Sequence, residues 1–181
     1  MKHLLPSLLA LAVLASASAA PQAAPPAAPQ VAQQIKTYYF DAARSGNISM
    51  LREFSAAGYD LNTRDEKGYT ALILAAYHGQ AAAVKLLLDA GADPCAEDKR
   101  GNTALMGAIF KGEVAIARRL VATECQPNQR NNAGQTPAMY AALFQRTEIL
   151  KSLQARGADM QAVDRAGNTP AALARGEFKS Q

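Results

Sequence analysis

A segment of 33 residues recurs along this chain, and the repetition constrains the fold more than any other feature of the sequence. Four stretches carry it: DEKGYTALILAAYHG from Asp65, DKRGNTALMGAIFKG from Asp98, NNAGQTPAMYAALFQ from Asn131 and DRAGNTPAAL from Asp164. No insertion separates one copy from the next. Because a unit of this length cannot bury an apolar face by itself, the sequence predicts a stack of copies.

Each copy opens with residues that favour a tight turn followed by a helix. Asp or Asn and then Gly suit a turn, since Gly accepts a positive φ and the Asx side chain bonds to nearby backbone. The Thr two residues later lies where a helix N-cap is expected, and Pro137 and Pro170 then occupy the first helical position. The residues in register are Gly68, Gly101, Gly134, Gly167, Thr70, Thr103, Thr136 and Thr169.

The rest of each copy predicts two short helices. The first is rich in Ala and Leu, and Met106 and Met139 occupy inward positions that predict core packing. The second ends in AGAD or RGAD, where glycine suits the left-handed residue after a helix. Two positions depart from this pattern, because Glu124 and Gln145 stand where glycine is expected. We expect altered loops there within an unchanged fold.

This turn–helix–helix unit, with G-x-T-[AP]-L and G-A-D, resembles the ankyrin repeat. The resemblance covers residues 65 to about 173, and residues 38–64 align as a degenerate first copy. It implies an all-α fold class, an ankyrin-repeat solenoid of helix–turn–helix units with short β-turn or hairpin loops. The copies are expected at residues 35–64, 65–97, 98–130 and 131–163, with a partial copy at 164–181 as a C-terminal cap.

Two segments precede the repeat domain of residues 35–181. Residues 1–19 combine a lysine, a short apolar run and the small residues Ala17, Ser18 and Ala19, a pattern that predicts a secretory signal cut after Ala19. The run is shorter than the roughly 20 residues that a membrane span needs. Residues 20–34 are rich in Pro, Ala and Gln and predict an extended tether. We therefore expect a periplasmic or secreted protein that is not inserted in a membrane after cleavage.

Cys95 and Cys125 are the only two cysteines, and an exported chain enters a compartment where thiols tend to pair. They occupy different positions in successive copies. Neighbouring ankyrin copies lie about 10 Å apart, whereas a disulfide needs Cα atoms within about 7 Å. The interpretation that this spacing favours is two buried small apolar side chains, and a strained disulfide is the alternative.

Charge and motifs argue against several classes of function. The net charge is +4, and basic and acidic residues are interleaved rather than gathered in one block, which disfavours a nucleic-acid partner. No metalloprotease, nucleophile-elbow or phosphate-loop motif is present, and one of the two histidines lies in the signal. We expect a monomeric protein that is not an enzyme, with no cofactor, no catalytic residues and no metal site.

The ankyrin resemblance implies that a protein partner binds the turn tips and the exposed face of the first helix in each copy. Aromatic and basic side chains there suit such a contact, because Tyr, Phe and Arg are enriched at interfaces. The candidate partner-binding residues are Arg44, Glu66, Lys67, Tyr69, Tyr77, His78, Lys99, Arg100, Asn102, Phe110, Lys111, Gln135, Leu143 and Phe144.

Alternatives remain open at this point. Tyr77 favours partner contact, Phe110 and Phe144 can serve either contact or packing between copies, and His78 is interpreted as a surface residue. For the whole protein, we favour a periplasmic adaptor or accessory factor that binds a partner, such as a stress-related enzyme, through its concave face. The alternative is a periplasmic inhibitor or immunity protein that neutralises a toxin or hydrolase.

Overall fold

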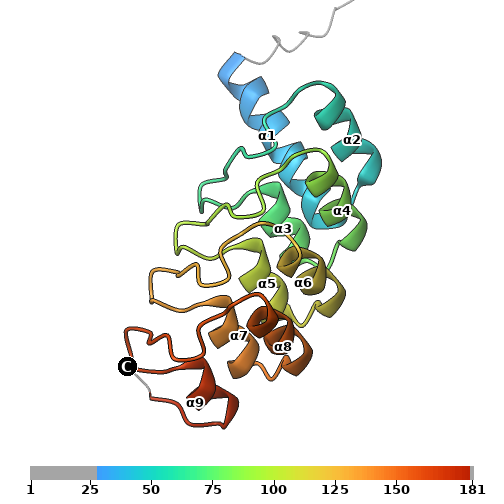
Figure 1. Ribbon diagram of the computed structural model, residues 1–181. Coiled ribbons are helices and arrows are strands. Elements are labelled where there is room, and N and C mark those ends of the chain that lie inside the picture. The colour runs from blue at the N-terminus through green and yellow to red at the C-terminus, as the bar shows by residue number, and fades with distance from the viewer. Residues whose placement is uncertain (1–27, 180–181) are drawn as a thin grey trace, which may run out of the picture.

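The computed structural model describes residues 28–179, which form a stack of helical hairpins (Figure 1). The expected signal and residues 20–27 lie outside the described residues. The helices are α1 (Ala28–Ser45), α2 (Ile48–Ala56), α3 (Ala71–Tyr77), α4 (Ala81–Asp89), α5 (Ala104–Lys111), α6 (Val114–Val121), α7 (Pro137–Leu143), α8 (Thr147–Ala155) and α9 (Pro170–Ala174). The all-α solenoid expected from the sequence is confirmed.

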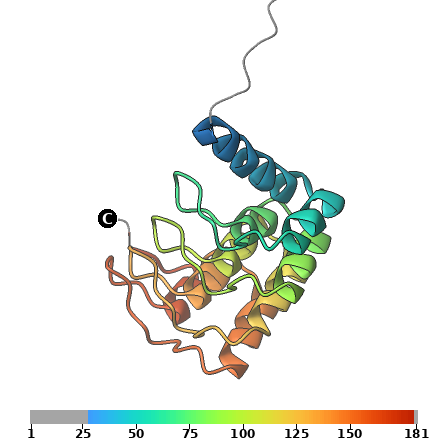
Figure 2. The same cartoon turned by 90° about the horizontal axis from the view of Figure 1, so that it is seen from above.

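The helices stand in two rows with hairpin loops on one side. Odd-numbered helices form the first row and even-numbered helices the second, and the loops between copies project away from both rows (Figure 2). Alanine lines the first row, where Ala75, Ala108 and Ala141 are fully buried. Such small side chains allow neighbouring helices to approach closely. Met106 and Met139 are also buried, as the sequence predicts.

The repeated spacing of Asp or Asn and Gly closes the hairpin at each tip. Oδ1 of Asp65 accepts hydrogen bonds from the backbone N–H of Lys67 at 2.9 Å and of Tyr69 at 2.8 Å. Asp98, Asn131 and Asp164 accept the same pair of bonds in their own copies. The predicted turns are therefore confirmed, and these Asp and Asn side chains are part of the loop structure.

The predicted threonine caps are also confirmed. The hydroxyl of Thr70 accepts a hydrogen bond from the backbone N–H of Ile73 at the start of α3. Thr103, Thr136 and Thr169 cap α5, α7 and α9 in the same way. Each cap satisfies an N–H group that has no partner within its helix.

Backbone bonds between tips join each copy to the next. The N–H of Lys99 donates to the carbonyl of Lys67 at 3.1 Å, and the N–H of Asn132 donates to the carbonyl of Arg100 at 2.9 Å. Arg165 donates to the carbonyl of Ala133 at 3.0 Å and extends the series to the last hairpin. The stacking of copies therefore fixes the tips in a row, as well as the helices.

The first copy differs from the others in the length of its first helix. α1 has 18 residues, whereas α3 has 7 and α5 has 8. It begins at Ala28, so the predicted extended tether of residues 20–34 is wrong for residues 28–34. The physical reason is that Pro29 lies in the first helical turn, where its missing N–H costs little, and Ala and Gln follow it. Residues 28–37 extend α1 beyond the repeat by about 15 Å.

The two positions where another residue replaces the expected glycine, Gln145 and Glu124, have different loop conformations. Gln145 keeps the loop of its counterparts at the cost of a positive φ of 54°. The loop at Glu124 changes instead, because this residue does not adopt a positive φ, whereas Gly91 and Gly157 do. Its side-chain bonding differs as well, because the hydroxyl of Thr123 donates to the carbonyl of Leu120 at 2.7 Å, whereas the equivalent residue of the second copy, Ala90, has no hydroxyl.

Cys95 and Cys125 are joined by a disulfide, with Cα atoms 5.5 Å apart. This corrects the interpretation of two buried thiols, since both residues are half-exposed. The 10 Å spacing applies to equivalent positions of neighbouring copies, whereas these two residues are 30 positions apart rather than 33.

The bond occupies the place of a hydrogen bond that recurs between other copies. In the register of the repeat, Cys95 corresponds to Asn62 and Asn128. Oδ1 of Asn62 accepts from the N–H of Asp93, and Oδ1 of Asn128 accepts from the N–H of Asp159, both at 2.8 Å. The disulfide therefore connects the second and third copies where an Asn side chain connects their neighbours.

Candidate partner-binding surface

Four apolar side chains form a continuous line across the first row of helices, which we call the aromatic strip: Tyr77, Phe110, Leu143 and Phe144. The first three are 39, 46 and 43 % exposed. The rings of Tyr77 and Phe110 stack with centroids 6.1 Å apart and an interplanar angle of 12°. Phe110 meets Phe144 edge to face at 5.1 Å. Side chains from three successive copies therefore make one surface.

The repeat explains why these side chains line up. Tyr77 and Leu143 are the last residues of α3 and α7, and Phe110 is the residue before the last of α5. The stacking of copies at 33-residue intervals turns this register into a row. The ammonium of Lys111 lies 5.1 Å from the centroid of the Tyr77 ring, a cation–π contact on the same surface.

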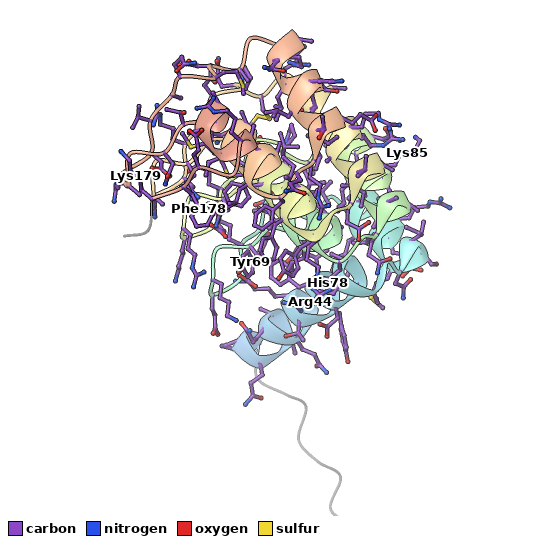
Figure 3. All side chains as sticks on the ribbon, turned by 90° about the horizontal axis from the view of Figure 1, so that it is seen from below. Arg44, Tyr69, His78, Lys85, Phe178 and Lys179 are labelled. Carbon is purple, nitrogen blue, oxygen red and sulfur yellow. A yellow bond between two sulfur atoms is a disulfide. The ribbon has the colours of Figure 1, made fainter. Side chains whose placement is uncertain are left out.

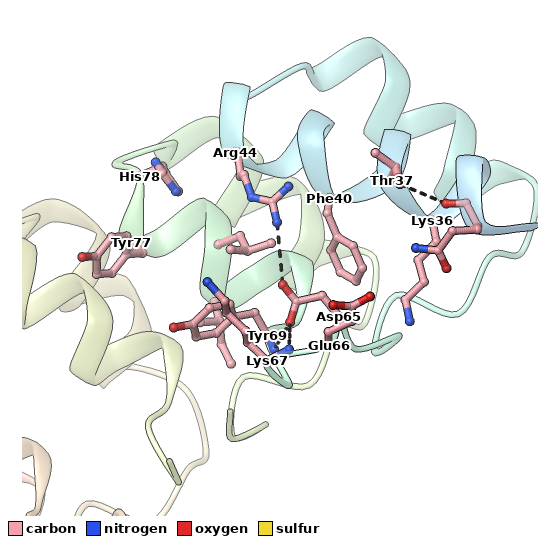
Figure 4. Close-up of a pocket in the computed structure, with 13 residues that line it drawn as sticks. Lys36, Thr37, Phe40, Arg44, Asp65, Glu66, Lys67, Tyr69, Tyr77 and His78 are labelled. Atoms are coloured by element: carbon pink, nitrogen blue, oxygen red, sulfur yellow. Dashed lines mark hydrogen bonds and ion pairs between the residues drawn. The ribbon is translucent and has the colours of Figure 1, made fainter. Parts of the chain in front are cut away.

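A groove of about 510 Å³ lies beside the strip, between α1 and the hairpin of the second copy. We call it the N-terminal groove. Its lining residues are Gln33, Lys36, Thr37, Phe40, Arg44, Asp65, Glu66, Lys67, Tyr69, Ile73, Leu74, Tyr77 and His78. Figure 4 shows Phe40 and Arg44 reaching from α1 toward Asp65 on the hairpin. Tyr77 belongs to both the groove and the strip.

Arg44 is engaged within the groove. Its guanidinium donates to Asp41 at 2.8 Å and lies 3.7 Å from the second carboxylate oxygen of Asp65. Asp65 already accepts two backbone bonds, so its charge is compensated on both oxygens. Arg44 thus lies on the face where the sequence predicts it, and of its two contacts the one with Asp65 joins α1 to the hairpin.

Two of the predicted tip residues belong to one polar network, in which Asn102 bonds to the next copy and Gln135 bonds within its own. Asn102 accepts hydrogen bonds from Asn131 at 2.9 Å and from the hydroxyl of Tyr140 at 3.0 Å. Gln135 accepts a bond from Asn131 at 3.1 Å. Burial raises the pKa of the Tyr140 hydroxyl above its ordinary value of 10.0. This polar network occupies Asn102 and Gln135, and their side chains are only half-exposed.

The other predicted residues lie on the surface. Glu66, Lys67, Lys99 and Arg100 are exposed at two neighbouring tips, and Tyr69 is half-exposed behind them. His78 is exposed and meets the Tyr77 ring edge to face at 5.5 Å, consistent with its interpretation as a surface residue. Arg44, Tyr69 and His78 gather near α1, whereas Lys85 lies on the far row of helices (Figure 3).

Apart from Arg44, reasoning from the sequence missed the residues that α1 supplies to the groove. Lys36, Thr37 and Phe40 line the groove, yet only the repeat register was used to select site residues. The spacing of Lys36 and Phe40, four residues apart, could have placed both on one helix face. The Pro-rich start of this segment obscured the helix.

Other kinds of site are not evident within residues 28–179. These residues contain no group of three or more His, Cys, Asp or Glu side chains able to hold a metal ion. No helix among them is long and apolar enough to span a membrane. Each buried side-chain nitrogen or oxygen in the same range has a hydrogen-bond partner.

Comparison with known proteins agrees with the repeat geometry. The family described as "Ankyrin repeats (3 copies)" matches residues 39–131 and 96–164, which together span more than half of the chain. The chain belongs to the ankyrin-repeat family. Ankyrin repeats are modules for protein–protein interaction, so the strip and groove lie on a protein of a kind that binds other proteins.

Two curated bacterial proteins show a local similarity. "Putative ankyrin repeat protein PA3287" of Pseudomonas aeruginosa is 45 % identical over 47 residues, which is 26 % of this chain and 28 % of that protein. "Putative ankyrin repeat protein YahD" of Escherichia coli K12 is 41 % identical over 51 residues, 28 % of this chain and 25 % of that protein. The matched part of this ankyrin-repeat protein thus spans about a quarter of each relative's length.

Proposed function

We propose that this ankyrin-repeat protein is an exported adaptor that binds a folded protein in the periplasm through the aromatic strip. The observation that carries the proposal is the contact of Tyr77, Phe110 and Phe144 across three copies while the strip stays open to solvent. Large aromatic side chains on an exposed surface are typical anchors of protein interfaces. The partner class that we propose is an enzyme whose activity or lifetime the adaptor increases.

Two independent features support export. Residues 1–19 have the composition of a cleaved secretory signal. The disulfide between Cys95 and Cys125 suits an oxidising compartment, since cytosolic thiols are kept reduced. Together these features favour the periplasm.

The proposal is tested by capture from periplasmic extract. The wild-type protein and a Tyr77→Ala/Phe110→Ala variant are immobilised, and retained proteins are quantified by mass spectrometry. A Lys85→Ala/Arg119→Ala variant is the control, because both residues are exposed on the second row of helices. Loss of two central aromatic anchors is expected to weaken binding by about 2–4 kcal/mol in total, so the strip variant should lose partners that the control retains.

Retention of the same partners by the strip variant and the wild type would contradict the proposal. The effect on a captured enzyme then separates adaptor from inhibitor. Greater activity or a longer lifetime of that enzyme supports the adaptor that we propose. Inhibition of a captured hydrolase or toxin would instead identify a periplasmic inhibitor.

A further inference from the structure

The N-terminal groove has a feature that the repeat pattern does not supply: its apolar floor is bordered by basic side chains without acidic partners. Phe40, Ile73 and Leu74 line the floor. Lys36 and Lys67 line the rim, and neither forms an ion pair with any residue in the range 28–179. An apolar site with positive charge at its border favours an apolar ligand group with negative charge beside it.

The acidic side chains of the groove are mostly engaged already. Asp65 is held by two backbone N–H groups and lies 3.7 Å from Arg44. Asp41, next to the groove on α1, accepts a 2.8 Å bond from the same guanidinium. Among the lining residues, Glu66 is therefore the acidic side chain without such bonds. The charge that the groove presents to a ligand is mainly that of its lysines.

The basic border continues toward the next hairpin. The tip of the third copy is joined to the tip of the second by the bond from Lys99 to the Lys67 carbonyl. Lys99 and Arg100 are exposed there, and no described residue forms an ion pair with either of them. Asp98 faces its own loop, where its oxygens accept bonds from two backbone N–H groups and the Asn102 amide. A chain leaving the groove along the tips would thus meet further cations.

We propose that the N-terminal groove binds an extended acidic segment of the partner protein, with one large apolar side chain of that segment on the Phe40, Ile73 and Leu74 floor. Carboxylates on either side of the apolar residue pair with Lys36 and Lys67, and acidic residues farther along reach Lys99 and Arg100. Tyr77 lines both the groove and the strip, so the two form one interface. This inference rests on the proposed function and names the chemistry of the partner.

The probe is a library of random twelve-residue peptides displayed on phage and selected on the purified full-length protein. Enriched peptides are then synthesised, and their affinities are measured by fluorescence anisotropy. We expect peptides with several Asp or Glu around one Phe, Tyr or Leu. A single-stranded oligo-dT of twelve nucleotides is measured in parallel, because basic grooves can also bind nucleic acid.

Two variants alter the groove in different ways. Lys36→Glu/Lys67→Glu reverses its border charge, and Thr37→Trp fills its space from an exposed position on α1. The charge reversal is expected to lower the affinity of the selected peptides by about tenfold or more, since a lost charge-assisted contact is worth one decade in affinity or more. Thr37→Trp is expected to lower it as well, because the indole occupies the space that the apolar side chain of the peptide needs. The matched controls on the second row of helices are Lys85→Glu/Lys151→Glu and Thr147→Trp. Circular dichroism verifies that every variant is folded.

Selection of acidic peptides that only the groove variants weaken supports the inference. The inference would be overturned if no peptide were enriched, or if the enriched peptides were neutral or basic. It would also be overturned if the control variants lost as much peptide affinity as the groove variants, or if oligo-dT bound more tightly than the peptides. The proposed function fails by a different result, which is retention of the periplasmic partner by the Tyr77→Ala/Phe110→Ala variant. The two outcomes are therefore distinguishable.

Discussion

Single residues explain both the features that every copy shares and the positions where one copy differs from the others. The four threonine caps and the Asx turns could be predicted from the sequence, because each depends on residues within a few positions of one another. The engagement of Asn102 could not, because its partners Asn131 and Tyr140 come from another copy. The role of a polar side chain at a tip thus depends on contacts with the next copy, and its position within the repeat does not predict these contacts.

At Gln145, replacement by glycine is expected to stabilise the protein. This residue has a φ of 54°, in the region where a non-glycine residue costs about 1 kcal/mol or more. Gln145→Gly should therefore raise the free energy of unfolding by about 1 kcal/mol, measured by urea denaturation. The reciprocal control is Gly112→Gln at the equivalent position, which should lower it. A destabilised Gln145→Gly variant would contradict this explanation.

Tyr39, which is buried, and Tyr140, which is half-buried, predict a loss of stability at high pH. Burial raises the pKa of Tyr39 and Tyr140 above 10.0, and in Tyr39 the negative charges of nearby groups add to the effect. Since the unfolded chain releases these protons first, the stabilising contribution is complete below pH 10 and is lost as pH rises above it. Each tyrosine adds up to about 1.4 kcal/mol per pH unit to the slope.

The check is urea unfolding between pH 9 and 11. The Tyr39→Phe/Tyr140→Phe variant should show a shallower decline than the wild type, although its stability at neutral pH is lower because hydrogen bonds are lost. Tyr38→Phe, at a residue whose side chain is 49 % exposed, serves as the control. An unchanged slope in the double variant would show that these hydroxyls do not govern the decline.

Among the elements of the fold, the helix pairs could be predicted from the sequence, whereas α1 and the disulfide could not. The helix pairs of copies two to four follow from Ala/Leu runs separated by a loop, so their existence was predictable. α1 was not, because Pro and Ala at its start also suit an extended tether, and the burial of Tyr39 and Phe40 that stabilises the helix is a tertiary effect. The disulfide joins positions that are 30 residues apart rather than 33, and the loop at Glu124, next to Cys125, differs from its counterparts, so the register alone could not predict the pairing.

The disulfide is expected to stabilise the boundary between the second and third copies. Cys95→Ala/Cys125→Ala should lower the free energy of unfolding by about 3 kcal/mol under non-reducing conditions. Cys95→Asn/Cys125→Ala should recover about 1 kcal/mol of this loss, since Asn62 and Asn128 accept a backbone bond at the same register. Urea denaturation with and without dithiothreitol measures both effects, and equal stability of the two variants would contradict the equivalence of Cys95 and Asn.

In the whole molecule, stacking of the copies brings residues at equivalent positions of the repeat together on one surface. No copy alone contains the strip, because its rings come from α3, α5 and the end of α7, and the groove needs both α1 and the second copy. The strip was predictable from the sequence because equivalent positions of a repeat must align. The groove was not, since five of its thirteen lining residues come from α1, whose first part lies outside the regular register of the repeat.

Export gives a prediction for the whole chain. Intact mass measurement of protein recovered from the periplasm should give a species that begins at Ala20, as expected for cleavage after Ala19. A sample from the same cells blocked in secretion serves as the control and should retain residues 1–19. Uncleaved protein found in the cytoplasm alone would contradict export and weaken the case for a periplasmic partner.

The central claim is that the aromatic strip contacts the partner directly. It is tested by placing a photo-crosslinking amino acid at position 110, on the strip, or at position 119, on the second row of helices, in otherwise wild-type protein. After irradiation of living cells, we expect a discrete cross-linked complex from position 110 and none from position 119. Cross-linking from position 119 alone, or the same products from both positions, would contradict it.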